Sequence, residues 1–126
     1  MVVSKISIKF TLKGIGVAYG ELRRVLAPMT FKAITQCLPI MGTIGVWINS
    51  GIFVPIGIKK GLEKAVKEVD AGTIAYWPVG DALCIFYKKS TPYSSVNVVG
   101  KITDGLEIFE NARRGTRIII EKVDEE

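Results

Sequence analysis

The feature that most constrains the fold is the stretch of residues 73–102, which reads TIAYWPVGDALCIFYKKSTPYSSVNVVGKI. It holds three short apolar runs, at residues 73–76, 82–87 and 96–102. A Trp-Pro-Val-Gly turn separates the first two runs, and a basic loop with a Thr-Pro-Tyr sequence separates the second from the third. Short β-branched or aromatic runs bounded by Gly, Pro or Ser are typical of β-strands. The stretch therefore predicts three successive strands.

The N-terminal part of the chain carries two further strand patterns. Apolar and polar residues alternate over residues 4–12. A period of two with one polar face predicts a strand in a barrel or at the edge of a sheet. Residues 15–22 return after a Lys-Gly turn and place only small side chains on one face, so a bulky neighbour must pack there or the strand must bend. These small residues are Gly16, Ala18 and Gly20.

Two helices are predicted, one early and one late in the chain. The first covers residues 27–38, where Pro28 suits the first helical position and Pro39 ends the helix. The second runs from Gly105 to about Arg113, with Asp104 as its side-chain cap in a capping box. Both helices are short, so they are expected to cap a β-structure rather than to form a layer of their own.

The remaining segments complete the predicted fold. A hairpin at residues 43–58 and a last strand at residues 116–123 bring the total to about eight strands. Residues 59–69 are expected to form one or two helical turns, and residues 124–126 an acidic tail. Antiparallel strands with two short helices predict a mainly β fold, a closed antiparallel β-barrel capped by the helices. The length suits a single domain over residues 1–126 with one core.

The hairpin contains the first candidate site. If Ile48 and Ile52 close a three-residue loop, Trp47 lies opposite Phe53 and the aliphatic residues share the other face, which suits a core. The same register places Val46 opposite Val54 and Gly45 opposite Pro55. Two interpretations of the aromatic pair remain open. It is either a cross-strand contact that stabilises the hairpin, or an exposed aromatic shelf that binds a ligand.

Several of these segments resemble the small prokaryotic cyclophilin-like proteins, a group of closed β-barrels whose biochemical role is largely unassigned. The resemblance rests on the segments AYWPVGDALCIFY, STP and VNVVGKI. The Ala-Pro-x-Thr pattern of residues 27–30 is similar to the start of the first helix of true cyclophilins. The Thr-Pro-Tyr of residues 91–93 resembles the Thr-Pro-Trp that lies beside the proline-binding groove of cyclophilins. The resemblance implies a barrel with a groove on its side.

The chain departs from the family where catalysis is concerned. True cyclophilins catalyse prolyl isomerisation with an arginine that stabilises the twisted amide, and the corresponding region here, residues 42–56, holds no arginine or other charged residue. The chain also has no histidine. The barrier to isomerisation is about 20 kcal/mol, and without the arginine we expect little or no isomerase activity. Whether the chain is an enzyme is left open, with a non-enzymatic role favoured and no catalytic residue assigned.

The leading functional prediction is a non-catalytic binding module for an extended peptide or a small apolar ligand. Two alternatives remain: a weak peptidyl-prolyl isomerase, and a structural homodimer that uses the charge-free hairpin of residues 43–58 as its interface. In the leading prediction, aromatic side chains contact the ligand and one of two amides donates hydrogen bonds to it. The predicted ligand-binding residues are Trp47, Phe53, Phe86, Tyr93, Asn97 and Asn49.

Charge and composition argue against nucleic acid and membrane as partners. The formal net charge is +5, but the basic residues are scattered among acidic ones, whereas a nucleic-acid site needs clustered cations with exposed aromatics. The nearest approach is the Arg-Arg-Gly-Thr-Arg run of residues 113–117, which follows a predicted helix. Residues 33–58 carry no charge, yet their prolines and glycines break a helix and favour a hairpin.

The same composition predicts neither a metal nor a cofactor. Cys37 and Cys84 are isolated within apolar runs, and without histidine a Ser-His or Cys-His pair is impossible. The N-terminus lacks the long apolar core of a signal peptide, so a cytoplasmic location is expected. Three Asn and one Gln make the chain poor in heat-labile amides, which suggests a thermophilic source.

Overall fold

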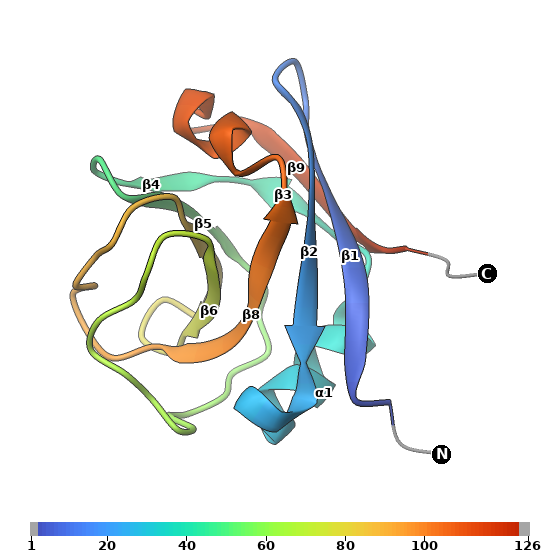
Figure 1. Cartoon of the computed structure of the whole chain (residues 1–126), viewed down its shortest axis with the longest axis vertical. Helices are drawn as coiled ribbons and strands as arrows, with labels where there is room; N and C mark the ends of the chain where they lie inside the picture. The colour runs from blue at the N-terminus through green and yellow to red at the C-terminus, as the bar shows by residue number, and fades with distance from the viewer. Residues whose placement is uncertain (1–2, 124–126) are drawn as a thin grey trace.

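The computed structural model describes residues 3–123 and shows a β-barrel of nine antiparallel strands. The strands follow the order β3-β9-β1-β2-β8-β6-β7-β5-β4 around the barrel (Figure 1). They are β1 (Lys5–Leu12), β2 (Gly16–Arg23), β3 (Ile40–Thr43), β4 (Gly45–Trp47), β5 (Gly51–Pro55), β6 (Thr73–Trp77), β7 (Ala82–Phe86), β8 (Asn97–Asp104) and β9 (Arg117–Lys122). The predicted barrel is confirmed. The acidic tail predicted at residues 124–126 lies outside the described residues.

The barrel is nearly closed because its two edge strands are parts of one bent segment. β3 pairs with β9 and β4 pairs with β5, and only Ile44 separates β3 from β4. The backbone N–H of Ile44 donates to the carbonyl of Thr116 at 3.0 Å, and the N–H of Gly115 donates to the carbonyl of Ile44 at 3.0 Å. The chain thus passes from one edge of the sheet to the other. This change of partner explains why nine strands form where about eight were predicted.

Short helices cover both ends of the barrel (Figure 1). Helix α1 (Pro28–Cys37) begins with its proline and buries Phe31 and Ile34, as predicted. The second predicted helix is the 3₁₀ helix η2 (Leu106–Asn111), and a further 3₁₀ turn, η1 (Arg24–Leu26), precedes α1. The predicted capping box was wrong. Gly105, with a φ of 83°, is the N-cap and no side-chain cap bond forms, because the chain turns sharply there from β8 into the helix.

The main core fills the inside of the barrel. β1 alternates as predicted, and its ring of Phe10 packs edge-to-face on Phe109 of η2, with ring centroids 5.6 Å apart. The small face of β2 is explained by bulky neighbours, as expected. A Cβ added to Gly20 would lie 2.8 Å from Ile74 and 3.2 Å from Phe10. Large side chains thus occupy the space that the glycine leaves.

The hairpin register differs from the predicted one by two residues. Gly45 pairs with Phe53, and Trp47 pairs with Gly51. A two-residue shift leaves the side chains of the paired residues on their predicted faces. Ile48, predicted on the core face, is an exception, because it lies in the turn and is 80% exposed. The reason for the shift is steric. The ring of Phe53 lies across Gly45, where a Cβ would clash with it, and Asn49, with a φ of 58°, takes the turn.

A long connection, residues 57–72, runs between β5 and β6 and is called the strap below. The helical turns predicted for residues 59–69 do not form; this prediction was wrong. Lys59 and Lys64 have φ values of 51° and 49°, which no helix accommodates. The strap instead forms two isolated β-bridges, between Val66 and Val96 and between Val69 and Ser90. It lies extended over the outside of the barrel.

Residues 33–58 form no single helix, as the prolines and glycines predict. They contain the end of α1, then β3, β4 and β5. Across residues 3–123, none of the helices has the length and apolar character that crossing a membrane requires.

Candidate functional site

Four of the six predicted site residues come together on the outside of the barrel. Trp47 lies at their centre, with its ring centroid 5.8 Å from that of Phe53, 5.9 Å from that of Phe86 and 5.1 Å from that of Tyr93. A fifth ring, Trp77, is closer still at 4.7 Å. We call these five residues the aromatic cluster. Trp77 was absent from the predicted set, although it occupies the same Trp-Pro-Val-Gly turn that defined the strand pattern.

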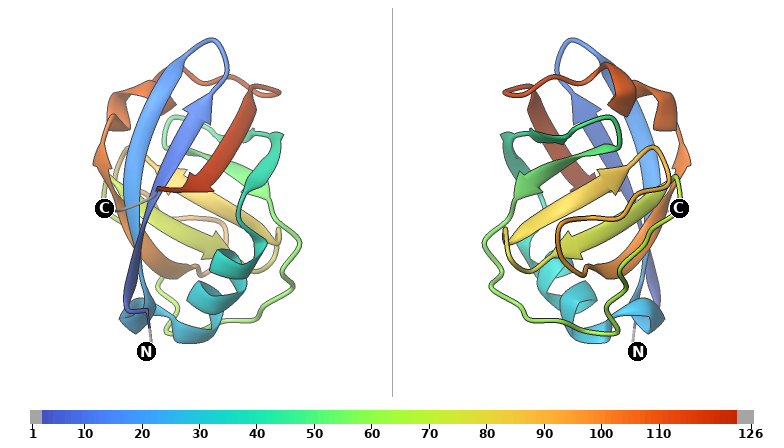
Figure 2. Two further views of the ribbon diagram at one scale, coloured as in Figure 1. Left: turned by 90° about the vertical axis from the view of Figure 1, so that its right-hand side faces the viewer. Right: turned by 90° about the vertical axis from the view of Figure 1, so that its left-hand side faces the viewer.

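The cluster lies on the outer face of β4, β5, β7 and β6, beneath the strap and the loop of residues 88–96. The right-hand view of Figure 2 shows both connections crossing in front of these strands. β7 is buried along its whole length because Leu83 and Ile85 point into the barrel core whereas Cys84 and Phe86 belong to a second, outer core. The outer core contains Trp47, Val69, Ala75, Cys84, Phe86 and Val96, with Phe53, Trp77 and Val98 against it.

Small side chains on the strands make room for the rings. Cys84 pairs with Phe53 on one side and with Ala75 on the other. Gly80 is equally required, because a Cβ there would clash with the indole of Trp77. Because the side chains at these positions are small, the outer face of the strands is flat there. Wide aromatic rings can therefore pack on it in contact with one another.

Trp47 forms the floor of the cluster rather than an open shelf, since only 5% of its surface is exposed. Its indole N–H has no hydrogen-bond acceptor among the described residues. Burial raises the pKa of the Cys84 thiol to about 12, although the Trp47 indole favours the thiolate. The thiol therefore stays protonated at neutral pH, and a protonated sulfur is a weak acceptor. The cluster thus holds a donor that the fold leaves without a strong partner.

Tyr93 is the ring that faces the solvent, with 83% of its surface exposed. It contacts Trp47 in a tilted arrangement, at an interplanar angle of 45°. Beside it the loop is hollowed by a shallow depression of about 250 Å³. The lining residues are Lys67, Thr91, Pro92, Tyr93, Ser94 and Ser95. An exposed aromatic ring at the rim of a depression is a surface on which a flat apolar group can stack.

The loop that carries Tyr93 is attached to the barrel by few contacts. The indole N–H of Trp77 donates to the Ser94 hydroxyl at 2.7 Å. The two isolated bridges join the loop to the strap through Ser90 and Val96. Strap and loop therefore support each other, and what holds the strap in place also positions Tyr93.

The two predicted amides lie elsewhere. Asn97 is completely buried, and all its polar atoms are used within the fold: its Oδ1 accepts from the N–H of Glu63 at 2.8 Å, and its Nδ2 donates to Thr30 Oγ1 and to the Gly61 carbonyl. Its partners belong to the strap and α1. Asn49 is exposed in the β4–β5 turn. The structure brings neither amide to the aromatic cluster.

Glu63 fastens the strap to the N-terminus of α1. Its Oε2 accepts from the N–H of Met29 at 2.9 Å, and its Oε1 accepts from the N–H and the hydroxyl of Thr30, both at 2.8 Å. Burial raises the pKa of this carboxyl, but the hydrogen bonds from Met29 and Thr30 outweigh it and hold the pKa below its ordinary value of 4.5. Glu63 thus caps a helix from outside the helix, a long-range contact that sequence spacing does not reveal.

A second polar contact fixes the start of the strap. The Tyr76 hydroxyl donates to Asp81 Oδ1 at 2.6 Å, and the same oxygen accepts from the N–H of Lys59 at 3.0 Å. Burial and the bond to Asp81 raise the pKa of Tyr76 to about 12. Burial raises the pKa of Asp81, but its hydrogen bonds lower this pKa by more than burial raises it. The net pKa therefore lies below 3.8. Tyr76 therefore stays neutral and Asp81 ionised.

The chemistry available at the cluster is that of apolar contact and hydrogen bonding. Within residues 3–123, His, Cys, Asp and Glu side chains form no group of three or more that would hold a metal ion. Of the residues around the depression, only Lys67 carries a charge. These groups suit binding of an uncharged or anionic flat ligand rather than proton transfer.

Comparison with known proteins places this geometry among related folds. A family model described as cyclophilin-like matches residues 4–121. No curated protein matches the chain. The chain is similar to the solution structure of the hypothetical protein AF2241 from Archaeoglobus fulgidus, with a TM-score of 0.78 and 27% identity; the match covers 95% of this chain and 96% of that one.

A second similar structure is that of McbB in complex with tryptophan. The TM-score is 0.78 at 13% identity, and the match covers 94% of this chain but 45% of McbB. The chain thus spans less than half of McbB, and the likeness to McbB concerns the fold alone.

Proposed function

The chain belongs to the cyclophilin-like family, and from this premise we propose that it is a binding module that holds a peptide or a small apolar ligand at the aromatic cluster. The observation that carries the proposal is the exposed ring of Tyr93, in tilted contact with Trp47 at the rim of a depression. A ring held in place on one face and open on the other loses little freedom when a ligand stacks on it.

The chemistry of the ligand follows from the lining. A proline ring or an aromatic group would stack on Tyr93, while the hydroxyls of Ser94 and Ser95 would bind its polar atoms. McbB, whose solved structure contains tryptophan, suggests free tryptophan as a second probe beside proline-containing peptides. Asn97 takes no part in this version of the site, because its amide is already hydrogen-bonded within the fold. Asn49 is left out as well, because it lies in the exposed β4–β5 turn.

The absence of charge on β4 and β5 favours binding over isomerisation. The segment from β3 to β5 contains no charged residue, so no arginine from it would stabilise a twisted amide. Weak isomerase activity stays a prediction, and a protease-coupled peptide assay decides it. A rate equal to the uncatalysed background would remove the isomerase.

The homodimer through residues 43–58 also stays a prediction, but the reason for it has weakened. Ile44, Ile52 and Val54 of this hairpin are buried in the barrel core, so most of its aliphatic face is already covered and Ile48 is the exposed member. Light scattering that gives the mass of a monomer at high concentration would contradict the dimer.

The binding proposal is tested by titration calorimetry and by tryptophan fluorescence. Both tryptophans of the chain lie in the aromatic cluster, so intrinsic fluorescence reports this surface and little else. We expect proline-containing peptides to change the emission saturably, with the same dissociation constant as the heat signal. L-tryptophan fluoresces itself, so its binding is followed by calorimetry alone. The variant Tyr93→Ala should lose this response.

The matched control is Tyr19→Ala, which removes a half-exposed tyrosine from β2, outside the cluster. It should bind like the wild type. Equal responses from the two variants, or neither heat nor a fluorescence change with any probe, would contradict the proposal.

A further inference from the structure

The barrel carries a second concave surface on the wall formed by β3, β9 and β1. This groove encloses about 370 Å³, the size of a small-molecule site. The left-hand view of Figure 2 looks onto this wall, with β9 lying between β1 and β3. None of the groove's lining residues belongs to the aromatic cluster, although β3 continues through Ile44 into β4. The residues of the groove are Thr11, Lys13, Met41, Gly42, Arg117, Ile118 and Ile119.

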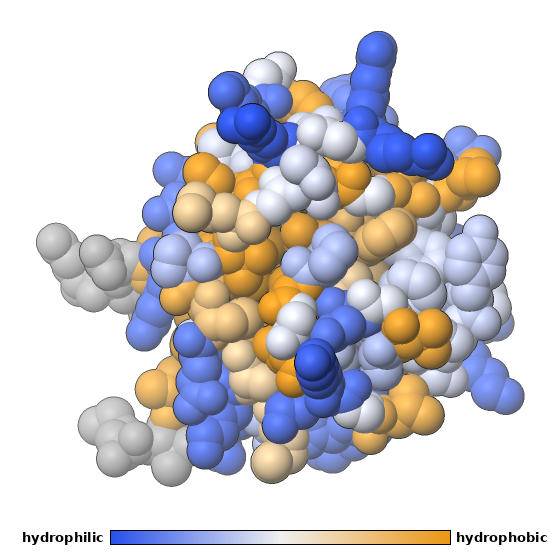
Figure 3. Space-filling model, turned by 180° about the vertical axis from the view of Figure 1, so that it is seen from behind, coloured by the Kyte–Doolittle hydropathy of each residue, from blue (hydrophilic) through white to orange (hydrophobic). Residues whose placement is uncertain are grey.

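The strand register divides the groove into an apolar and a cationic half. Met41 pairs with Ile119, which in turn pairs with Thr11, so these three side chains form one row across the wall. Met41 is 73% exposed and Ile119 38%, so together they present an apolar surface. Seen from behind, hydrophobic residues form a broad patch in the middle of the molecule, with charged residues above and below (Figure 3).

The neighbouring row is positively charged. The carbonyl of Arg117 accepts the N–H of Lys13 at 3.0 Å, so both cationic residues lie at the same end of the groove. Arg117 is two residues before Ile119 on β9, so the two side chains share one face of the strand. The backbone there is held firmly. The N–H of Arg113 donates to the Thr116 hydroxyl at 3.1 Å, and Gly115 and Thr116 bond to the backbone of Ile44. The groove thus has a fixed cationic end.

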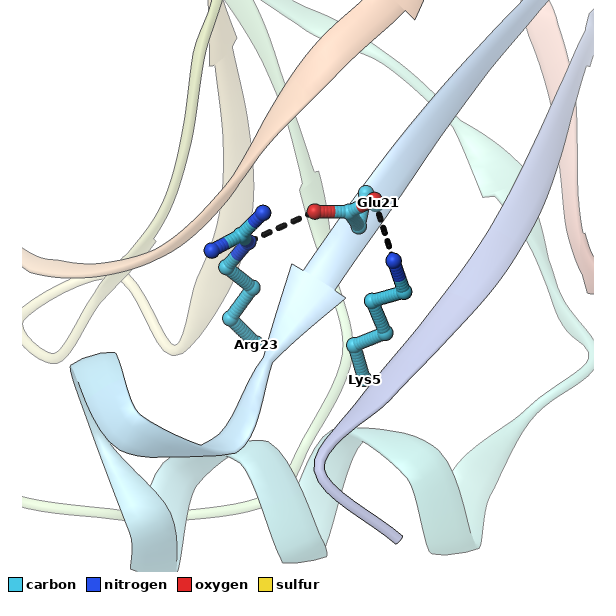
Figure 4. Close-up of polar contacts among 3 residues, drawn as sticks. All are labelled: Lys5, Glu21 and Arg23. Carbon is cyan, nitrogen blue, oxygen red and sulfur yellow. Dashed lines mark hydrogen bonds and ion pairs between the residues drawn. The ribbon is translucent and has the colours of Figure 1, made fainter.

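The cations of the groove are uncompensated, in contrast to those at the far end of the same strands. At the start of β1 and the end of β2, away from the groove, Glu21 is paired with Lys5 at 3.7 Å and with Arg23 at 2.6 Å (Figure 4). These are the only ion pairs among residues 3–123. Lys13 and Arg117 therefore present two positive charges to the solvent at the end of an apolar groove, with no carboxylate of the described chain to neutralise them.

We propose that this groove binds an amphipathic anion: a carboxylate or phosphate ester placed between Lys13 and Arg117, with an unbranched apolar chain lying over Met41 and Ile119. A guanidinium binds such a head group through two parallel N–H bonds. The apolar row removes the chain from water. The site lies apart from the aromatic cluster and does not depend on the proposed function.

The experiment uses two fluorescent probes of like shape and different charge. The anion 8-anilinonaphthalene-1-sulfonate is expected to bind the wild type, and the neutral N-phenyl-1-naphthylamine to bind at least about tenfold more weakly. The double variant Lys13→Gln/Arg117→Gln should weaken the anion about tenfold or more and leave the neutral probe unchanged. Its control is Lys101→Gln/Lys122→Gln, which removes the same charge from exposed positions outside the groove.

Competition then identifies the head group. Decanoate and decyl phosphate should displace the anionic probe, and decanol should not; the stronger of the two anions shows whether the head is a carboxylate or a phosphate. Met41→Gln should weaken both decanoate and decyl phosphate. Equal binding by the two double variants would overturn the proposal, as would equal affinity of the wild type for the two probes. Loss of the anionic probe in Tyr93→Ala alone would place it at the aromatic cluster and also overturn the proposal.

Discussion

The two cores of this molecule, one inside the barrel and one outside it, are built on different principles. The inner core is surrounded by paired strands and contains mostly branched aliphatic side chains, with Phe10 of β1 in contact with Phe109 of the capping helix η2. The outer core has strands on one side only. Its other side is covered by the strap and by the loop of residues 88–96, and its rings surround Trp47 in edge-to-face and tilted contacts.

The difference lies in what holds the cover in place. Continuous backbone ladders join the strands around the inner core. Two isolated bridges, the Trp77–Ser94 bond and the contacts of Glu63 and Asn97 hold the cover of the outer core. Regions with few backbone bonds open at lower free-energy cost than a paired sheet does. The barrel therefore supplies the stability, and the outer core is the part that can adapt to a ligand.

The largest expected effect is in the inner core. Phe10→Ala removes a fully buried ring that packs on Phe109, and such truncations cost about 3–5 kcal/mol. The free energy of unfolding from urea titration, followed by far-ultraviolet circular dichroism, measures it. A loss below that of the variants in the outer region would break the distinction between the two cores.

The next effect concerns Asn97. Asn97→Ala leaves the Glu63 N–H and the Gly61 carbonyl without their buried partner, which costs about 1–3 kcal/mol. Since these groups belong to the strap, we expect hydrogen exchange to quicken in the strap and in residues 88–96 and to stay slow in β1 and β2. Uniform acceleration across the barrel would show that the two cores open as one unit.

A smaller, pH-dependent effect is expected for Glu63. Its folded pKa lies below 4.5, so the stability it contributes is present above that pH and is lost as the pH falls through the folded pKa. Glu63→Gln should cost about 1 kcal/mol at neutral pH. When the urea titration is repeated near pH 3, the difference in the free energy of unfolding between variant and wild type should shrink. A difference that stays constant with pH would mean that the charge of Glu63 contributes nothing.

The smallest effect on stability is expected for Tyr93→Ala. The ring is mostly exposed, and surface substitutions usually change the free energy of unfolding by less than about 0.5 kcal/mol. Urea titration checks this, while ligand binding should be lost. A large loss of stability would contradict this prediction. It would show that Tyr93 belongs to the packing of the outer core rather than to its binding surface.

The inner core was largely predictable because it depends on local patterns. Alternation in residues 4–12 and the β-branched runs of residues 73–102 predict strands. Antiparallel strands with two short helices fit a closed barrel, and the resemblance to the cyclophilin-like proteins implies the same fold. The exact pairing was less predictable: the two-residue shift between β4 and β5 depends on the ring of Phe53 crossing Gly45. No local signal in the hairpin carries that information.

The outer core was predictable only in part. Trp47, Phe53, Phe86 and Tyr93 gather as the aromatic pattern suggested. The role of Asn97 was not foreseen, because its partners Glu63 and Thr30 are far away in the sequence. A helix cap supplied from a distant strap follows from the closed fold alone. The cytoplasmic location and the thermophilic source stay predictions.

The central claim is that the outer core, not the barrel interior, receives the ligand. Its most direct test is the pair of indole N–H signals in a ¹H–¹⁵N correlation spectrum, because Trp77 is bonded to Ser94 whereas Trp47 has no strong acceptor within residues 3–123. During titration with a proline-containing peptide or L-tryptophan, we predict that the Trp47 signal moves saturably while backbone signals of β1 and β2 stay fixed. Movement confined to β1 and β2, or no movement of either indole at saturating ligand, would contradict the account.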